Sequence, residues 1–154
     1  MKARMDIIHI APPGAFKAVM GLQEYVNKCG LEKSLLDLVF LRASQINGCA
    51  YCIDMHTKDA RASGESEQRL YELDAWRECP FYSDRERAAL AWTEAVTLVA
   101  AGHVPDDVYA EASKEFSDIE LINLTLAVTQ INTWNRINIA FRNMPGEYRV
   151  AKAA

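Results

Sequence analysis

The segment DLVFLRASQINGCAYCIDMH, residues 37–56, contains a strongly apolar run followed by two closely spaced cysteines. A helix over residues 35–41 would be apolar on every side except at Asp37, so it belongs in a protein core. Asn47-Gly48 then signals a turn, after which a second helix begins. A core helix joined to another helix by one tight turn indicates an all-α fold organised around this segment.

Two thiols and an imidazole fall on one face of the second helix. Cys49, Cys52 and His56 are spaced i, i+3 and i+7, which brings them onto the same side. Both cysteines lie in the first turn, where unpaired backbone N–H groups and the helix dipole favour thiolate over thiol. The spacing also permits a disulfide across one turn. This arrangement is suited to two-electron redox chemistry.

The rest of the chain predicts further helices and no strand of useful length. We expect about seven helices, over residues 14–28, 32–46, 49–63, 66–76 and 83–101, from 105 onward, and from 117 to 141. Ser83 to Glu86 and Ser117 to Glu120 have the capping-box pattern that opens a helix. We expect a single domain over residues 1–154, with a helical core at 14–142, an N-terminal arm at 1–13 and a loose tail at 148–154.

The composition is that of an ordinary globular protein. The chain has 154 residues, half of them hydrophobic, and a net charge of −4. There is no polybasic face for nucleic acid or an anionic membrane, and no window of roughly 20 apolar residues for a bilayer span. The first residues do not form a secretory signal, so we expect a cytoplasmic protein. In a reducing compartment, Cys-x-x-Cys indicates redox or metal chemistry.

Metal binding is the main competing interpretation of the cysteine pair. Cys49, Cys52 and His56 provide three zinc ligands, but a structural zinc site needs four, and no second Cys-x-x-Cys or His-x₃-His completes the set. Haem attachment would need histidine directly after Cys52. We therefore expect no metal and no cofactor. Cys29 and Cys79 are more typical of lone buried cysteines, and His9 and His103 of surface or capping residues.

His56 and Asp37 are candidate partners of the thiols. A histidine one turn beyond Cys52 is suited to taking its proton and returning it to a leaving group. Asp37 would be costly to bury unpaired, so a histidine, an arginine or a backbone donor is expected beside it. Arg42 and Arg136 are candidate structural partners. In the functional interpretation, Asp37 orients or charges His56.

With these residues in place, the chain resembles the alkylhydroperoxidase D (AhpD)-like group of the carboxymuconolactone decarboxylase family. The resemblance covers roughly residues 34–101 and extends loosely to Trp134-Asn135-Arg136. It rests on residues 41–49 (LRASQINGC), the Cys-x-x-Cys-x-x-x-His pattern, residues 57–61 (TKDAR) and residues 86–95 (ERAALAWTEA).

The resemblance implies an all-helical fold, a homo-oligomer (dimer, trimer or hexamer) and thiol-dependent reduction of hydroperoxides. Carried over to this chain, Cys52 attacks the peroxide, Cys49 resolves the product, and His56 relays protons. Asp37 stands where the family usually has glutamate, and Tyr51 stands where well-studied peroxidases have histidine. These departures shorten the acid and remove one proton carrier.

Two alternatives stay open at this point. The family also includes decarboxylases, which lack this cysteine pair. An oligomeric redox-sensing or interaction protein would instead use the pair only as a dithiol–disulfide switch. For a peroxidase, the sequence leaves open the hydroperoxide and the dithiol reductant, for which a lipoyl domain, a thioredoxin-like protein or a small thiol are candidates.

Overall fold

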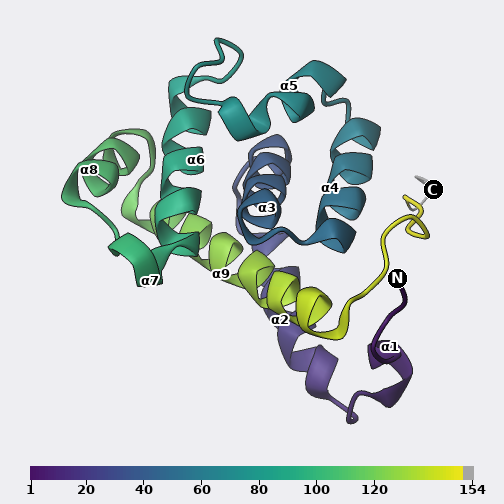
Figure 1. Ribbon diagram of the computed structural model, residues 1–154. Coiled ribbons are helices and arrows are strands. Elements are labelled where there is room, and N and C mark those ends of the chain that lie inside the picture. The colour runs from purple at the N-terminus through teal and green to yellow at the C-terminus, as the bar shows by residue number, and fades with distance from the viewer. Residues whose placement is uncertain (151–154) are drawn as a thin grey trace.

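The computed structural model describes residues 1–150 of the chain (Figure 1). Every regular element within these residues is a helix. The elements are α1 (Ile7–Ile10), α2 (Ala15–Val26), α3 (Lys33–Asn47), α4 (Ala50–Ala62), α5 (Glu67–Tyr71), the 3₁₀ helix η1 (Leu73–Ala75), α6 (Asp84–Thr97), α7 (Val99–Gly102), α8 (Asp106–Glu115) and α9 (Asp118–Phe141). The all-α prediction is confirmed.

Helix α3 lies at the centre of the molecule, with α4 and α6 on either side of it in Figure 1 and α9 running across its end. It packs against all three of these helices. Leu38, Val39 and Leu41 are fully buried, which explains why this helix is apolar on all sides. The monomer thus covers residues 35–41 by itself.

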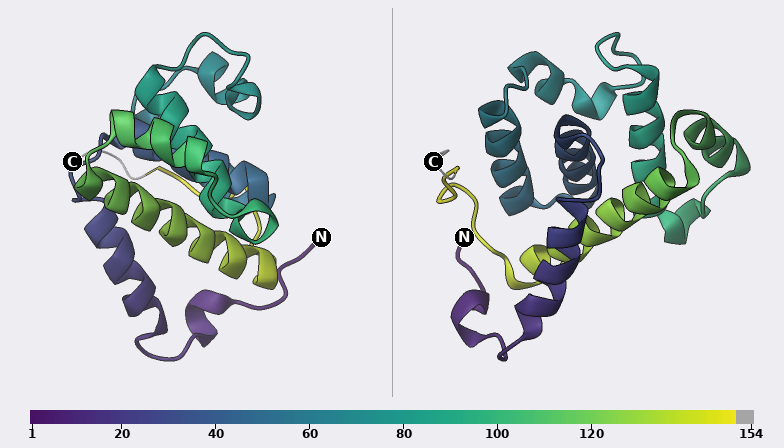
Figure 2. Two further views of the ribbon diagram at one scale, coloured as in Figure 1. Left: turned by 90° about the vertical axis from the view of Figure 1, so that its left-hand side faces the viewer. Right: turned by 180° about the vertical axis from the view of Figure 1, so that it is seen from behind.

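The long helix α9 is the second organising element. Ser117 and Glu120 form the expected capping box at its start. Along its length α9 contacts α3, α4 and α6, and on its other side α2 packs against it (Figure 2). Its inward positions Leu124, Val128 and Ile131 join the main apolar core. Helix α9 therefore connects the core to the region of the cysteine helix α4.

Two of the helices expected from the sequence are each divided in the structure. The segment predicted as one helix to residue 101 breaks at Leu98, which separates α6 from α7. The β-branched neighbours Thr97 and Val99 weaken helix formation there, and the Thr97 hydroxyl accepts a hydrogen bond from Asn132 (3.0 Å). The helix expected over 66–76 is likewise divided, into α5 and η1.

The N-terminal arm at residues 1–13 contains a short helix, residues 7–10, which is capped by Asp6. Arg4 anchors this arm to the end of α9, donating from its backbone N–H to the Phe141 carbonyl (2.9 Å) and from its guanidinium to that of Ala140 (2.8 Å). Ile7 is buried. The arm therefore packs as part of the helical structure.

The expected loose tail begins with an anchored residue. Tyr148 donates its hydroxyl proton to Asp59 (2.7 Å), and its carbonyl accepts from Lys58 (3.2 Å). The segment after α9 is thereby held against α4. The remainder of the predicted tail, residues 151–154, lies outside the described residues.

A buried asparagine joins the last turn of α3 to α9. Asn135 is fully buried; it donates to the Ser44 hydroxyl (3.0 Å) and accepts from the Asn47 amide (2.9 Å). Buried amides that lose their partners are costly. This pair of hydrogen bonds fixes the end of α3 immediately before the cysteines.

We predict that Asn135→Leu lowers the free energy of unfolding by about 2 kcal/mol, because Ser44 and Asn47 each lose a buried partner. Urea denaturation of the oxidised protein measures the change. Thr133→Ala, on the exposed side of the same helix, is the matched control and should shift stability by less than about 0.5 kcal/mol. Equal stability of the two variants would contradict the assigned role.

Candidate thiol redox site

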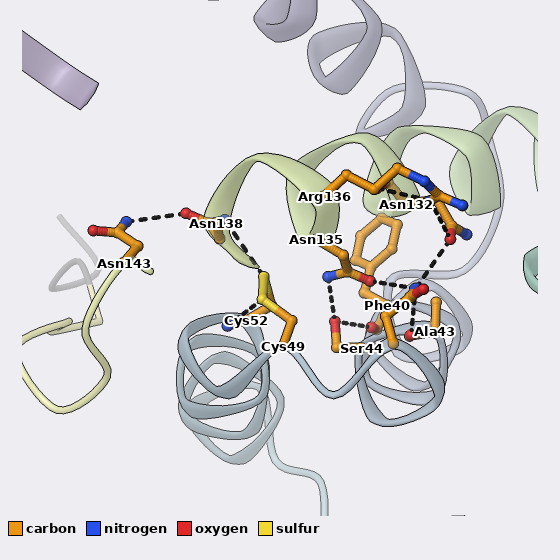
Figure 3. Close-up of a disulfide and its surroundings, with 11 residues drawn as sticks. Phe40, Ala43, Ser44, Cys49, Cys52, Asn132, Asn135, Arg136, Asn138 and Asn143 are labelled. Atoms are coloured by element: carbon orange, nitrogen blue, oxygen red, sulfur yellow. Dashed lines mark hydrogen bonds between the residues drawn. A yellow bond between two sulfur atoms is a disulfide. The ribbon is translucent and has the colours of Figure 1, made fainter. Parts of the chain in front are cut away.

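The two cysteines stand at the start of α4, as predicted, and are joined by a disulfide (Figure 3). Cys49 is the N-cap residue, and its sulfur accepts a hydrogen bond from the Cys52 N–H (3.4 Å). The preceding Gly48 has a left-handed backbone (φ 67°), which glycine adopts without steric cost. The Cα atoms of the pair are 5.3 Å apart, within the usual disulfide range.

Both sulfur-bearing residues are buried, each with 1% exposure. Gly48 is exposed, but Cys49 itself points inward because it lies on the buried face of α4. Of the two cysteines, only Cys52 lines a cavity. Access from solvent is therefore through Cys52.

Asn138, on α9, contacts the reactive pair directly. Its side chain is buried, and its amide N–H donates to the Cys52 sulfur (3.4 Å; Figure 3). The Asn138 carbonyl oxygen in turn accepts from Asn143 (3.0 Å), which fixes the direction of the amide. A donor held at this sulfur strengthens when the sulfur carries negative charge. Asn138 thus favours the thiolate form of Cys52.

The segment after α9 holds Asn143 in place. The Asn143 N–H donates to the Asn138 carbonyl of the main chain (2.9 Å), and further along Gly146 donates to the Asp54 carboxylate (3.0 Å). Together with Tyr148 on Asp59, these bonds tie the C-terminal segment to α4. The orientation of Asn138 therefore depends on a segment distant in sequence from the cysteines.

His56 is buried on the same face of α4, as the spacing predicted. Its ring lies 5.3 Å from that of Phe40, and its Nε2 atom has no hydrogen-bond partner among the described residues. Burial, assisted by the charge of Lys33, lowers the pKa of His56 from 6.5 to about 4. The imidazole is therefore neutral at physiological pH.

Asp37 is buried on α3, but its partner is neither Arg42 nor Arg136. Its carboxylate accepts from Lys33, one turn earlier (2.6 Å). Arg42 pairs instead with Glu94 and Asp74. Burial raises the pKa of Asp37, and Lys33 acts in the opposite direction. No direct hydrogen bond joins Asp37 to His56 within the described residues, so any influence of this carboxylate passes through Lys33 or the intervening space.

A cavity of about 310 Å³ adjoins Cys52 and His56. Its apolar wall comes from α1, α2, α3 and α9, and includes Ile7, Phe16, Met20, Phe40, Ile131 and Trp134. The rings of Phe16 and Trp134 are stacked, with centroids 5.8 Å apart. Gln130 and Asn138 add polar groups from α9. The site is therefore a disulfide sulfur at the edge of an apolar chamber.

Most of the residues that line this cavity could not be predicted from the sequence. Ile7 and Phe16 belong to segments that carry no chemical motif, and Asn138 is one of several asparagines in α9. The spacing of Gln130, Trp134 and Asn138, at i, i+4 and i+8, was the available signal that they share a face. Only the packing of α9 on α4 shows that this face is the one beside the sulfur.

Comparison with known proteins agrees with this architecture. The model of the carboxymuconolactone decarboxylase family matches residues 13–95, more than half of the chain. This chain belongs to the carboxymuconolactone decarboxylase family. The family resemblance inferred from the cysteine motif is thereby confirmed.

Two similar proteins cover nearly the whole chain. YdfG of Bacillus subtilis, whose function is uncharacterised, is 44% identical over 143 residues, 93% of this chain and 97% of that protein. A crystal structure from Agrobacterium tumefaciens is 46% identical with a TM-score of 0.91, covering 96% of this chain and all of that one. That protein is of unknown function and has been suggested to be an AhpD-type antioxidant defence protein.

An alkyl hydroperoxide reductase AhpD of Bradyrhizobium diazoefficiens is a more distant relative. It is 28% identical over 97 residues, 62% of this chain and 47% of that protein. This chain therefore has the AhpD-like fold and contains the Cys49–Cys52 pair.

The remaining cysteines and histidines lie apart from the site. Cys79 is buried and its thiol donates to Glu72 (2.9 Å), and Cys29 is partly buried. His9 pairs with Asp6, and His103 caps α7. Within residues 1–150, no three His, Cys, Asp or Glu side chains gather as a metal site would require. In the same residues, every helix is too short or too polar to traverse a lipid bilayer.

We predict that stability falls by up to about 3 kcal/mol as the pH drops from about 6.5 to about 4, since each pKa unit corresponds to about 1.4 kcal/mol. Unfolded His56 binds a proton in this window, whereas folded His56, with a pKa of about 4, stays neutral. His56→Gln should flatten this part of the profile, measured by urea denaturation across pH with the disulfide intact. His103→Gln is the control and should keep the wild-type dependence of stability on pH. If His56→Gln also kept that dependence, the result would contradict burial of a neutral imidazole.

Proposed function

We propose that this protein is a thiol peroxidase that reduces organic hydroperoxides with Cys52 as the attacking sulfur. The observation that carries the proposal is the position of Cys52. It lines an apolar cavity, and its sulfur accepts a hydrogen bond from Asn138. It also lies one helical turn from the neutral His56, whose Nε2 atom has no hydrogen-bond partner among the described residues. These features supply a substrate chamber, thiolate stabilisation and a proton carrier.

The reaction begins with the dithiol form. His56 takes the Cys52 proton, and the resulting thiolate balances the charge on the imidazolium, which otherwise has no negative partner in contact. The thiolate attacks the terminal oxygen of the hydroperoxide, an S–O bond forms and the O–O bond breaks. The alkoxide leaves as the alcohol after taking the proton from His56. Cys52 is then a sulfenic acid.

Cys49 completes the cycle. The Cys49 sulfur attacks the Cys52 sulfur, the S–O bond breaks, and the proton of the Cys49 thiol passes to the departing hydroxide, which leaves as water. The disulfide then spans the first turn of α4. A dithiol reductant then restores both thiols and is itself oxidised. Because both sulfurs are buried and only Cys52 lines the cavity, a slender dithiol such as a lipoyl arm or a small thiol suits this site better than the surface of a folded thioredoxin-like protein.

The cavity favours this reaction over decarboxylation. A lactone carboxylate would need a cationic or strongly donating partner, and the lining residues include no lysine or arginine. A pure redox sensor would need the cysteine pair but no substrate chamber. The chamber of about 310 Å³ beside Cys52 is therefore the feature that favours an enzyme.

Homo-oligomer formation remains part of the proposal, on altered grounds. The apolar run at residues 35–41 is buried within the monomer and is not available for a subunit contact. The exposed apolar side chains include Ile119 and Ile122 of α9 and Tyr109 of α8. Tyr109 and Ile122 line a groove together with Trp92 and Leu126. Exposed apolar patches of this kind are typical of subunit contacts.

The direct test is hydroperoxide consumption by the purified protein with a small dithiol as reductant. Cys52→Ser should lose the activity entirely, because no other thiol faces the cavity. Cys29→Ser is the matched control and should keep the wild-type rate. Turnover that survives in Cys52→Ser, or that is absent from the wild type with several hydroperoxides and dithiols, would contradict the proposal.

Asn138→Leu should slow the peroxide step about 10-fold, because a charge-assisted hydrogen bond to the thiolate is worth about 1.5–3 kcal/mol and part of it is lost to the attacking transition state. The pH at which iodoacetamide alkylates Cys52 rapidly should also move upward. At alkaline pH the two rates should converge, which a purely structural defect would not produce. A parallel loss of rate at every pH would contradict thiolate stabilisation by Asn138.

Asp37→Asn should slow the same step by about 10-fold, equivalent to roughly one pKa unit at His56. The carboxylate offsets the positive charge of Lys33, which disfavours protonation of His56. Adding Lys33→Met to Asp37→Asn should restore part of the rate, as stopped-flow oxidation of the reduced protein would show. If Asp37→Asn reacts at the wild-type rate, Asp37 has no part in the proton relay.

A further inference from the structure

Three buried side-chain atoms lack a hydrogen-bond partner among the described residues: His56 Nε2, Gln130 Oε1 and Trp134 Nε1. All three residues line the cavity that Cys52 also lines. A buried polar group without a partner costs about 1–3 kcal/mol. Because all three residues line one cavity, that cavity is the candidate site for a molecule with matching polar groups.

The proposed reaction accounts for only one of these atoms. His56 stands one turn from Cys52 and exchanges its proton with the peroxide. Gln130 and Trp134 belong to α9, at i and i+4, so they are neighbours on one face. Asn138, which contacts the Cys52 sulfur, follows at i+8 on that face. At 1.5 Å of rise per residue, Trp134 and Gln130 lie about 6 and 12 Å along the helix from the reacting end.

The two remaining atoms form a complementary pair. Trp134 offers an indole N–H, and Gln130 offers an amide oxygen. The amide nitrogen of Gln130 is directed to Gln23 (3.5 Å), and the indole ring is stacked on Phe16. A hydroxyl group is able to accept from the first and donate to the second.

We propose that the substrate is an organic hydroperoxide that carries a second polar group, a hydroxyl, on the side of its apolar body away from the peroxide. Gln130 and Trp134 bind that hydroxyl, while the peroxide lies at Cys52 and His56. The inference rests on the proposed peroxidase function and adds a specificity determinant to it. An unsubstituted apolar hydroperoxide would fill the same cavity but leave both distal atoms unpaired.

A matched pair of compounds tests the recognition: cumene hydroperoxide and its para-hydroxymethyl derivative. With the reduced wild-type protein, the hydroxylated compound should oxidise Cys52 about 10-fold faster at limiting concentration, the gain expected from about one net hydrogen bond. In Gln130→Leu and in Trp134→Phe this ratio should fall to near one. Thr129→Val, on the exposed side of α9, is the control and should keep the ratio.

Binding to the Cys52→Ser variant separates recognition from chemistry. Cumyl alcohol and its para-hydroxymethyl derivative stand for the two products, and tryptophan fluorescence reports their affinities. The diol should bind about 10-fold more tightly, and Gln130→Leu should remove the difference. Equal affinities, as expected if a water molecule already satisfies both atoms, would overturn the inference even where peroxide turnover is normal. Absence of turnover with a retained diol preference would overturn the peroxidase function and leave the hydroxyl site.

Discussion

The buried hydrogen bonds of Asn135 to Ser44 and Asn47 are the constraint on which the site depends. They fix the end of the central helix α3 against α9, and α4 begins only one turn later. Since α4 carries both cysteines and His56, its position relative to α9 is set at this point. The contact of Asn138 with Cys52 follows from the same arrangement.

Burial then determines the chemistry of the individual groups. At the N-terminus of α4, backbone N–H groups and the Asn138 amide favour negative charge on sulfur. One turn further along, burial and the charge of Lys33 disfavour positive charge on His56. A proton transferred from Cys52 to His56 creates a thiolate and an imidazolium that compensate each other. The two residues are therefore best regarded as one coupled pair.

The sequence was sufficient to predict the local features of this protein. The apolar run around Leu38, the glycine of the turn and the i, i+3 cysteines each leave a periodic or conformational signature, and the main helices α2, α3, α4 and α9 lie close to their expected positions. The long-range contacts leave no such signature in the sequence. A histidine, an arginine or a backbone donor was expected beside Asp37, whereas Lys33, one turn away, is its partner. Nothing in the sequence indicated that Ile7 of the N-terminal arm helps to line a cavity. Such contacts depend on how helices pack, which a single sequence does not specify.

The central claim is that Cys52 is the sulfur that meets the hydroperoxide, and one measurement tests it most directly. Reduced Cys49→Ser protein, which lacks a resolving thiol, is treated with one equivalent of cumene hydroperoxide in the presence of dimedone and analysed by peptide mass spectrometry. The account predicts a single dimedone adduct on Cys52, because its sulfenic acid has no neighbour to condense with. An adduct on Cys29 or Cys79, or no adduct at all, would contradict it.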